Sequence, residues 1–294
     1  MADVVKLALP AHLLFLFLRI IPVGLRRSLF CILSLAYYHI ASRRRLITLH
    51  NLSKAFPDKN LDEIQRLAKG AYRNVAIMAA EFADLPFLTK ENIGNILDVE
   101  GLKHCVAALE KNRGLLMFGA HFGNWELGVI AASLLLKPLV LVYRPLDNSV
   151  LENLVTWVRL STGNRAVAKN SAMWPMVRVL RQNGIIGLLI DQNVANYEGV
   201  FVDYFGIEAC TTNGLAHLAL LTGAPVVPAF MVRQDDNRYR FVFGPEVNLI
   251  RTEDEEKDVV ENTSIFTTII EDMVRRYPDQ WLWLHERWKG KKEL

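Results

Sequence analysis

The chain has 294 residues, of which 51% are hydrophobic and 22% charged, so it holds enough apolar material for one large core or two modest ones. This composition excludes general disorder, and three cysteines without a CxxC pair or a Cys/His cluster exclude a disulfide framework and a structural zinc site. The formal net charge is +3, but residues 1–60 carry nine Lys/Arg against two Asp, a balance of +7 that leaves −4 for the remainder.

Residues 1–50 are the most apolar part of the chain and predict basic, membrane-associating helices that precede a catalytic domain over residues 51–294. The apolar pieces are separated by single or paired arginines and are Leu7–Leu18, Ile20–Leu25 and Ser28–Ile40. No stretch reaches the roughly 18 uninterrupted apolar residues of a confident membrane span. Leu7–Leu25 could cross or enter the bilayer, lie in its interface with the arginines against lipid phosphates, or simply cover the catalytic core. Pro22 and Gly24 predict a break, which favours the interfacial position.

A long helix is expected over Leu61–Leu85, and from Asp98 onward short apolar runs alternate with helical patterns. The expected strands are Leu115–Phe118, Leu139–Tyr143, Ala166–Ala168, Ile185–Ile190, Phe201–Tyr204, Val226–Met231 and Tyr239–Phe243. The expected helices are Trp125–Leu136, Ser149–Leu160, Trp174–Gln182, Gly214–Leu221 and Asp258–Arg276. This alternation predicts an α/β fold with a largely parallel central sheet flanked by helices. Ligands bind such sheets at the carboxyl ends of the strands, so the residues that follow each strand are the functional candidates.

The segment from Gly114 to Glu126 places His121 just beyond a buried strand and Glu126 in the first turn of the next helix. A histidine at a strand end acts as a general base when a carboxylate holds its other ring nitrogen. Glu126 is close enough in sequence to turn back toward the ring, and Gly119 and Gly123 allow close backbone approach on either side. A lone histidine is more often a buried structural residue, but the paired acid and the flanking glycines favour catalysis.

Other catalytic signatures are missing from the sequence. It has no Gly-x-Ser-x-Gly elbow, Walker A loop, Rossmann fingerprint or HExxH zinc-protease motif. Direct acyl transfer, with His121 as general base on an alcohol, needs no covalent enzyme intermediate. We therefore expect neither a metal nor a nucleotide cofactor.

Polar residues that follow the other strands are candidates for substrate binding. Arginine forks suit phosphate oxygens, and Arg144 and Arg159 are expected to bind phosphate, whereas Arg165 is expected to be a solvated surface charge. Asp191 and Gln192 follow a buried strand. They could bind a polar headgroup or merely cap the loop.

Together these residues resemble the lysophospholipid acyltransferase superfamily, whose hallmark is His-x4-Asp/Glu, and more narrowly its bacterial lipid A biosynthesis branch of lauroyl and myristoyl transferases. The resemblance covers most of the chain. Its seven elements, in order, are Asn51–Pro57, His121-x4-Glu126, Tyr143-Arg144-Pro145, Asp191-Gln192, Val202–Gly206 with Thr211-Thr212, Thr222–Pro228 and Trp281–Lys289. His-x4-Glu alone would be weak support, but seven elements in sequence order are strong.

The resemblance implies transfer of a fatty acyl chain from acyl carrier protein, or less often acyl-CoA, to a hydroxyl of a lipid A precursor, with no other cofactor. His121 would deprotonate the acceptor hydroxyl, and Glu126 would hold and polarise His121. Phosphate or carboxylate groups would be bound by Arg144 and Arg159. The stretch from Gly206 to Thr212, including both of these residues, would lie beside the acceptor.

The implied partners are acyl carrier protein, a glycolipid acceptor and an anionic phospholipid surface, without nucleic acid, at the cytoplasmic face of the inner membrane. The Phe-Pro-Glu-Gly block of the wider superfamily is missing, and Asp191-Gln192 and Phe205-Gly206 occupy the corresponding region. This departure weakens assignment to the glycerolipid enzymes. Two alternatives remain: acylation of another membrane lipid, such as a phosphatidylinositol mannoside or an aminolipid, and a non-catalytic lipid-binding protein.

Overall fold

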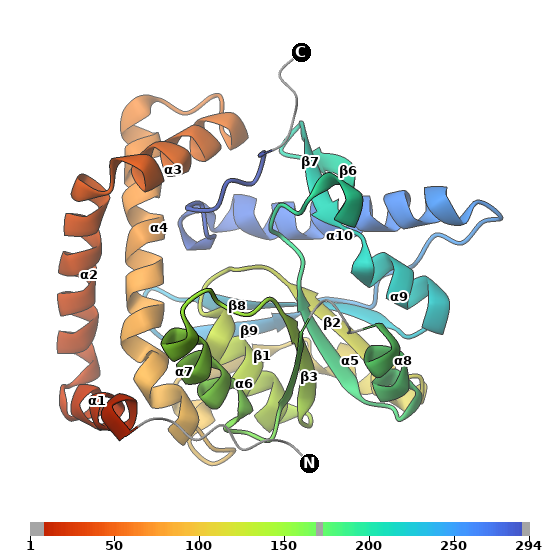
Figure 1. Ribbon diagram of the computed structural model, residues 1–294, viewed down its shortest axis with the longest axis horizontal. Coiled ribbons are helices and arrows are strands. Elements are labelled where there is room, and N and C mark those ends of the chain that lie inside the picture. The colour runs from red at the N-terminus through yellow and green to blue at the C-terminus, as the bar shows by residue number, and fades with distance from the viewer. Residues whose placement is uncertain (1–8, 169–172, 290–294) are drawn as a thin grey trace.

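A seven-stranded sheet lies at the centre of the protein, in the strand order β1-β9-β8-β2-β5-β3-β4 (Figure 1). The structure is a computed structural model that describes residues 9–168 and 173–289. The strands of this sheet are β1 Leu97–Glu100, β2 Leu115–Gly119, β3 Leu139–Tyr143, β4 Arg165–Ala168, β5 Ile185–Leu189, β8 Val226–Arg233 and β9 Tyr239–Phe243. Neighbouring strands are parallel except β8 and β9. The predicted α/β fold with a largely parallel sheet is confirmed.

The sheet is buried on both faces, as its central strand β2 shows. Leu115 and Met117 belong to one buried cluster, whereas Leu116 and Phe118 belong to the other. Side chains alternate between the faces of a strand, so two covered faces make β2 a continuous apolar run. One face is covered by α5 Leu102–Glu110, α6 Trp125–Leu135 and α7 Ser149–Leu160. The other is covered by α8 Met173–Arg181, α9 Gly214–Thr222 and α10 Glu255–Arg276.

One expected strand lies outside the central sheet. β6 Gly199–Tyr204 pairs antiparallel with β7 Ile207–Thr212, and the hairpin packs on α10. Its two-residue turn places both Phe205 and Gly206 at positive φ, 59° and 75°. Such turns favour Asn-Gly or Asp-Gly, and a phenylalanine in the left-handed region is uncommon, so the turn and β7 were not predicted.

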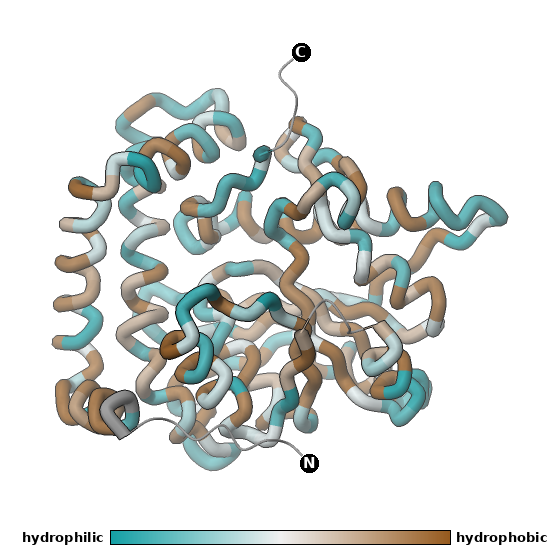
Figure 2. Tube along the Cα trace, in the orientation of Figure 1, coloured by the Kyte–Doolittle hydropathy of each residue, from teal (hydrophilic) through white to brown (hydrophobic). Residues whose placement is uncertain are grey.

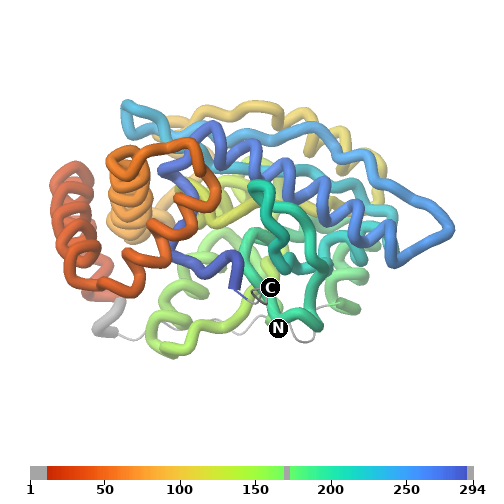
Figure 3. The backbone as a smooth tube through the Cα atoms, turned by 90° about the horizontal axis from the view of Figure 1, so that it is seen from above, coloured from red at the N-terminus to blue at the C-terminus, as the bar shows by residue number. Residues whose placement is uncertain are grey.

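Four helices precede the first strand: α1 Leu9–Ile20, α2 Val23–Ile40, α3 Ser42–Ala55 and α4 Leu61–Glu81. The break expected at Pro22 is confirmed, because α1 ends and α2 begins on either side of it. The helix expected to reach Leu85 ends as α-helix at Glu81, and a 3₁₀ segment that contains Pro86 continues the chain. α2 runs alongside α4 (Figures 1 and 3). The domain boundary expected at residue 50 falls within α3.

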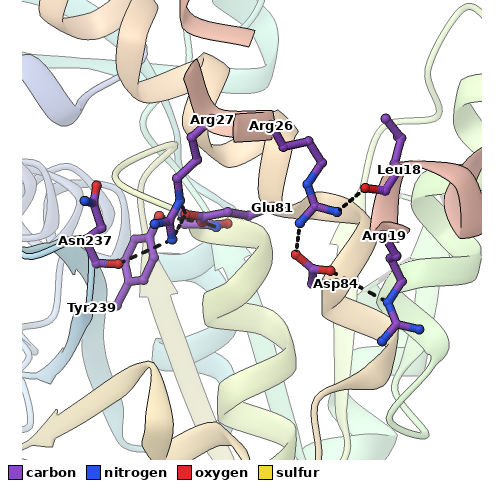
Figure 4. Close-up of polar contacts among 9 residues, drawn as sticks. Leu18, Arg19, Arg26, Arg27, Glu81, Asp84, Asn237 and Tyr239 are labelled. Atoms are coloured by element: carbon purple, nitrogen blue, oxygen red, sulfur yellow. Dashed lines mark hydrogen bonds and ion pairs between the residues drawn. The ribbon is translucent and has the colours of Figure 1, made fainter. Parts of the chain in front are cut away.

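Three arginines of α1 and α2 pair with carboxylates at or just beyond the end of α4. Arg26 is 1% exposed and pairs with Asp84, to which Arg19 also lies close, at 3.7 Å (Figure 4). Arg27 Nε donates to the Glu81 carboxylate at 2.8 Å. A buried guanidinium requires such a carboxylate, because an unpaired charge is strongly disfavoured away from water. These contacts connect α1 and α2 to the end of α4 and to the 3₁₀ segment that follows it.

Apolar residues are nevertheless frequent along α1 and α2 (Figure 2), and many of their large side chains are exposed. Exposed large hydrophobic side chains there include Leu13, Phe17, Ile20, Leu25, Ile32, Leu33 and Ile40. Among residues 9–168 and 173–289, no helix combines the length and the apolarity needed to cross a bilayer. Leu7 and Ala8, at the start of the expected apolar segment, lie outside the described residues. An apolar surface of this kind marks an interaction site.

Candidate active site

The register of two neighbouring strands brings His121 and Asp191 together. β2 and β5 are parallel, and Gly119 is paired with Leu189. His121 and Asp191 each lie two residues beyond this pair, so the two side chains face each other. The His121 ring Nδ1 lies 2.8 Å from Asp191 Oδ1, and the His121 main-chain N–H donates to Oδ2 at 3.0 Å. The carboxyl ends of these central strands therefore carry an acid and a base in direct contact.

Asp191 is buried yet ionised. Burial raises its pKa, but the charge of His121 and hydrogen bonds from His121 and the Trp281 indole outweigh burial and hold the pKa below its ordinary value. Trp281 Nε1 donates to Oδ2 at 2.8 Å. An ionised carboxylate accepts the Nδ1 proton of histidine, which leaves Nε2 unprotonated and able to accept a proton.

The second ring nitrogen of His121 lies on the accessible side. The side chain is 22% exposed, and the Gln192 amide Nε2 lies 3.4 Å from His121 Nε2. With the proton on Nδ1, the amide is the donor and Nε2 the acceptor. Gln192, expected either to bind substrate or to cap a loop, thus contacts the atom that would receive the acceptor's proton.

The C-terminal segment completes the site. Trp281 forms an isolated antiparallel bridge with Phe122, and the Leu282 N–H donates to the His121 carbonyl at 3.0 Å. In the sequence, Trp281 stands out only as the first residue of the closing motif Trp281–Lys289. No local pattern could reveal its function, because the indole reaches a carboxylate 90 residues earlier in the chain.

Glu126 does not contact His121 as the resemblance implied. Both Glu126 oxygens accept hydrogen bonds from Arg159, whose Nε lies at 2.8 Å. The position at His121 Nδ1 is taken by Asp191, because α6 begins with Trp125 and carries Glu126 away from the ring. Trp125 lies between them: its indole N–H donates to Glu126 at 3.1 Å, and its ring packs edge-on against His121 with the centroids 5.3 Å apart.

The turn that joins His121 to Glu126 is held rigidly. Gly123 has φ +57°, and a Cβ there would lie 1.7 Å from the Met231 carbonyl oxygen, so only glycine fits. Asn124 caps α6 by accepting the Leu127 N–H at 3.0 Å. Its amide donates to Glu81 at 2.7 Å. Glu81, which Arg27 also contacts, thus links helix α2 to this turn.

The remaining substrate-binding candidates are spread apart. Arg144 is exposed and lies 3.9 Å from Asp147, whereas Arg159 is committed to Glu126. Gly206 lies in the β6–β7 turn, and Thr212 lies at the opposite, open end of that hairpin. Only the Thr212 end approaches the loop after Asp191, through an isolated bridge between the neighbouring Thr211 and Asn193. Gly206 and Thr212 thus lie at opposite ends of the hairpin, and the expectation that the stretch from Gly206 to Thr212 lies beside the acceptor stays a prediction.

Comparison with known proteins agrees with this geometry. A family model described as bacterial lipid A biosynthesis acyltransferase matches residues 9–290. The chain belongs to that family. The lipid A acyltransferase fold thus includes the N-terminal helices, and the resemblance drawn from the seven sequence elements is confirmed.

Individual relatives of this lipid A acyltransferase family member are moderately similar. The lipid A biosynthesis palmitoleoyltransferase of Escherichia coli (strain K12) is 29% identical over 249 residues, 84% of this chain and 79% of that protein. The lipid A biosynthesis lauroyltransferase of the same strain is 28% identical over 253 residues, which cover 85% of this chain and 81% of that protein. The phosphatidylinositol mannoside acyltransferase of Mycolicibacterium smegmatis (strain ATCC 700084 / mc(2)155) is 25% identical over 242 residues, covering 81% and 77%. The protein is accordingly an acyltransferase.

Replacing Glu126 with glutamine tests its part in this acyltransferase. We expect kcat to fall about 100-fold, because a loosened Glu126–Arg159 pair lets Trp125 shift against His121 and small misplacements at a reacting group are costly. The thermal midpoint should stay close to that of the wild type. Glu261→Gln, an exposed change on α10, is the control. Wild-type turnover in both variants would reduce Glu126 to a structural residue.

Proposed function

We propose that this protein transfers a fatty acyl chain from an acyl carrier protein thioester, or from acyl-CoA, to a hydroxyl of a lipid A precursor. The observation that carries the proposal is the contact between His121 Nδ1 and the buried Asp191 carboxylate. It leaves the other ring nitrogen free to accept a proton on the exposed side. The family match supplies the class of reaction, and the acceptors named for the relatives supply the class of substrate.

In the proposed reaction, His121 Nε2 removes the proton of the acceptor hydroxyl as the oxygen attacks the thioester carbonyl. The tetrahedral intermediate then collapses: the carbon–sulfur bond breaks, and the imidazolium returns its proton to the sulfur. An ester and a free thiol are formed, and His121 is regenerated. Asp191 stabilises the imidazolium between the two proton transfers. No covalent bond to the enzyme is needed.

We assign supporting roles to neighbouring residues. Glu126, paired with Arg159, orients the Trp125 ring that packs on His121. This pairing uses the charge of Arg159, so Arg144 is the better proposed phosphate ligand of the two. Gln192 and Thr212 remain proposed substrate contacts at the edge of the site.

We also propose that the apolar outer surface of α1 and α2 lies in the cytoplasmic leaflet of the inner membrane. Hydrophobic side chains exposed along two consecutive helices support burial in a lipid interface. Arg43 and Arg44, exposed at the start of α3, are available to anionic headgroups. This position would bring the site to its lipid acceptor.

The direct test is transfer by the purified full-length protein. Acyl carrier protein thioesters and acyl-CoA of several chain lengths are offered with a lipid A precursor, a phosphatidylinositol mannoside or an aminolipid, and products are weighed by mass spectrometry. We expect the lipid A precursor to gain one acyl chain. The mannoside is the second candidate because a relative named for that substrate is 25% identical. Vesicle binding without transfer to any acceptor would instead support a non-catalytic lipid-binding protein.

A further inference from the structure

A polar pocket of about 420 Å³ opens beside the loop that follows Asp191. Three distant segments line it: Arg44 at the start of α3, the loop from Asn193 to Asn196, and the C-terminal segment at His285, Glu286 and Lys289. The acyl transfer steps described above use none of these side chains. The chemistry of the lining therefore decides what the pocket can bind.

Positive charge predominates around the pocket. Arg44 and Lys289 line it, and Arg43 contacts Glu286, which also lines it. The opposing acid is Glu286, which lies 3.4 Å from Arg43 and 3.6 Å from Lys289 and so shares one negative charge between two cations. Arg44 donates to the Leu284 carbonyl at 3.2 Å, a contact that leaves its charge uncompensated. These four groups carry a net charge of +2.

Neutral polar groups complete the lining. The Asn193 N–H donates to His285 Nε2 at 3.1 Å, so the His285 ring is an acceptor at that atom. Burial lowers the pKa of His285, and the nearby cations reinforce that effect against the pull of Asp191, so the ring is neutral at pH 7. His285 therefore adds a neutral polar group, and no charge, to the pocket.

The pocket lies beside the loop that contacts His121. Asn193 follows Gln192, whose amide lies 3.4 Å from His121 Nε2. The same short loop therefore contacts the His121 ring with one residue and lines the pocket with the next.

We propose that this pocket binds a phosphate group of a substrate, with Arg44 and Lys289 as its cationic ligands. The proposal rests on the acyl transfer proposed above and names a binding subsite for it. Arginine offers a planar fork to two phosphate oxygens, and lysine adds a point charge. Arg159, expected from the sequence to bind phosphate, is instead neutralised by Glu126.

Two substrates of the reaction could supply the phosphate. One is a phosphorylated sugar of the acceptor glycolipid, and the other is the phosphopantetheine arm of the acyl donor. The two phosphate groups are attached to different parts of a molecule, but both offer phosphate oxygens to the cations of the pocket. Paired substrates with and without the phosphate separate the two sources.

The experiment compares the wild type with Arg44→Gln, Lys289→Gln and the double variant. Each is assayed with a phosphorylated and a dephosphorylated lipid A precursor, and with acyl-phosphopantetheine and acyl-pantetheine thioesters as donors. For the wild type, we expect loss of the phosphate from one substrate to raise its KM about 10- to 100-fold, the range of charge-assisted hydrogen bonds. In the double variant that phosphate should no longer matter, and kcat should be unchanged. Arg66→Gln, an exposed change on α4, is the control.

The phosphate that binds in the pocket belongs to the substrate, acceptor or donor, whose KM in the double variant no longer depends on its phosphate. The proposal would be overturned if the double variant raised KM equally for phosphorylated and phosphate-free substrates, or did not raise it at all. Binding of the same lipids to His121→Ala, measured by calorimetry, tests the pocket without turnover. If wild-type protein transfers no acyl group, the proposed function fails, whereas phosphate-dependent binding that needs Arg44 would still support the pocket.

Discussion

Replacing His121 with alanine is expected to lower kcat for acyl transfer by about 10²- to 10⁴-fold, the usual contribution of a general base. The alanine variant keeps the main-chain N–H that donates to Asp191 but has no group to take the acceptor's proton. Initial rates with saturating donor and acceptor, together with thermal melting, measure the effect. The melting temperature should fall only modestly, because Asp191 loses the imidazole but keeps its hydrogen bonds from the main chain of residue 121 and from the Trp281 indole.

A histidine outside the site provides the control. His217 is exposed on α9, and His217→Ala removes an imidazole of the same size. Its turnover should equal that of the wild type. Equal transfer by wild type and His121→Ala would show that the mechanism proposed here is wrong.

Asp191→Asn should lower kcat by about 10³- to 10⁴-fold, as expected when the acid of a catalytic His–Asp pair becomes an amide. In the wild type, Oδ2 accepts two N–H groups, from His121 and Trp281, and Oδ1 faces the His121 ring. Asparagine has one acceptor oxygen. If that oxygen stays with the two N–H groups, the amide NH₂ faces Nδ1, and the ring proton must move to Nε2. His121 Nε2 would then carry a proton and could not accept the proton of the acceptor hydroxyl.

Nitrogen-15 NMR of the histidine ring reports the tautomer directly. We expect the proton on Nδ1 in the wild type and on Nε2 in Asp191→Asn. An unchanged tautomer with full activity would contradict the assigned role of Asp191.

A milder change, at a residue that donates a hydrogen bond to the same carboxylate, should shift the pH dependence of activity. Trp281→Phe removes one hydrogen bond that lowers the Asp191 pKa, so that pKa should rise. A carboxylate with a lowered pKa keeps its negative charge until the pH falls below that pKa. Activity should therefore be lost at a higher pH on the acid side than in the wild type. Trp283→Phe, whose indole donates to the Pro278 carbonyl instead, should leave the acid limb unchanged.

Most strands of the central sheet, and the position of His121 just beyond one of them, could be predicted from local pattern. The contact between His121 and Asp191 could not. Leu139–Tyr143 and Tyr239–Phe243 match β3 and β9 because an apolar run between turn residues determines them locally. The contact between His121 and Asp191 depends instead on strand order. β5 lies between β2 and β3, although it follows both in the chain, and no pattern within a strand encodes its neighbours.

The inward arginines were missed for a similar reason. Arg26 and Arg27 stand between apolar pieces, a pattern shared by interfacial helices and by helices that pair with buried acids. Their partners, Asp84 and Glu81, lie more than 50 residues later at the end of α4. Only the packing of α2 on α4 distinguishes the two cases.

The contacts around Glu81 restrict how this protein can be altered. Its carboxylate accepts from Arg27 of α2, from Asn124 of the catalytic turn and from Tyr239 of β9. An N-terminus exchanged for that of a relative must therefore bring an arginine to the same place, or a buried negative charge will be left unmatched beside the turn. Changes on the apolar outer surface of α2 are free of this requirement. The outward side of that helix can therefore diverge among relatives, whereas its inner side stays linked to the turn that carries His121.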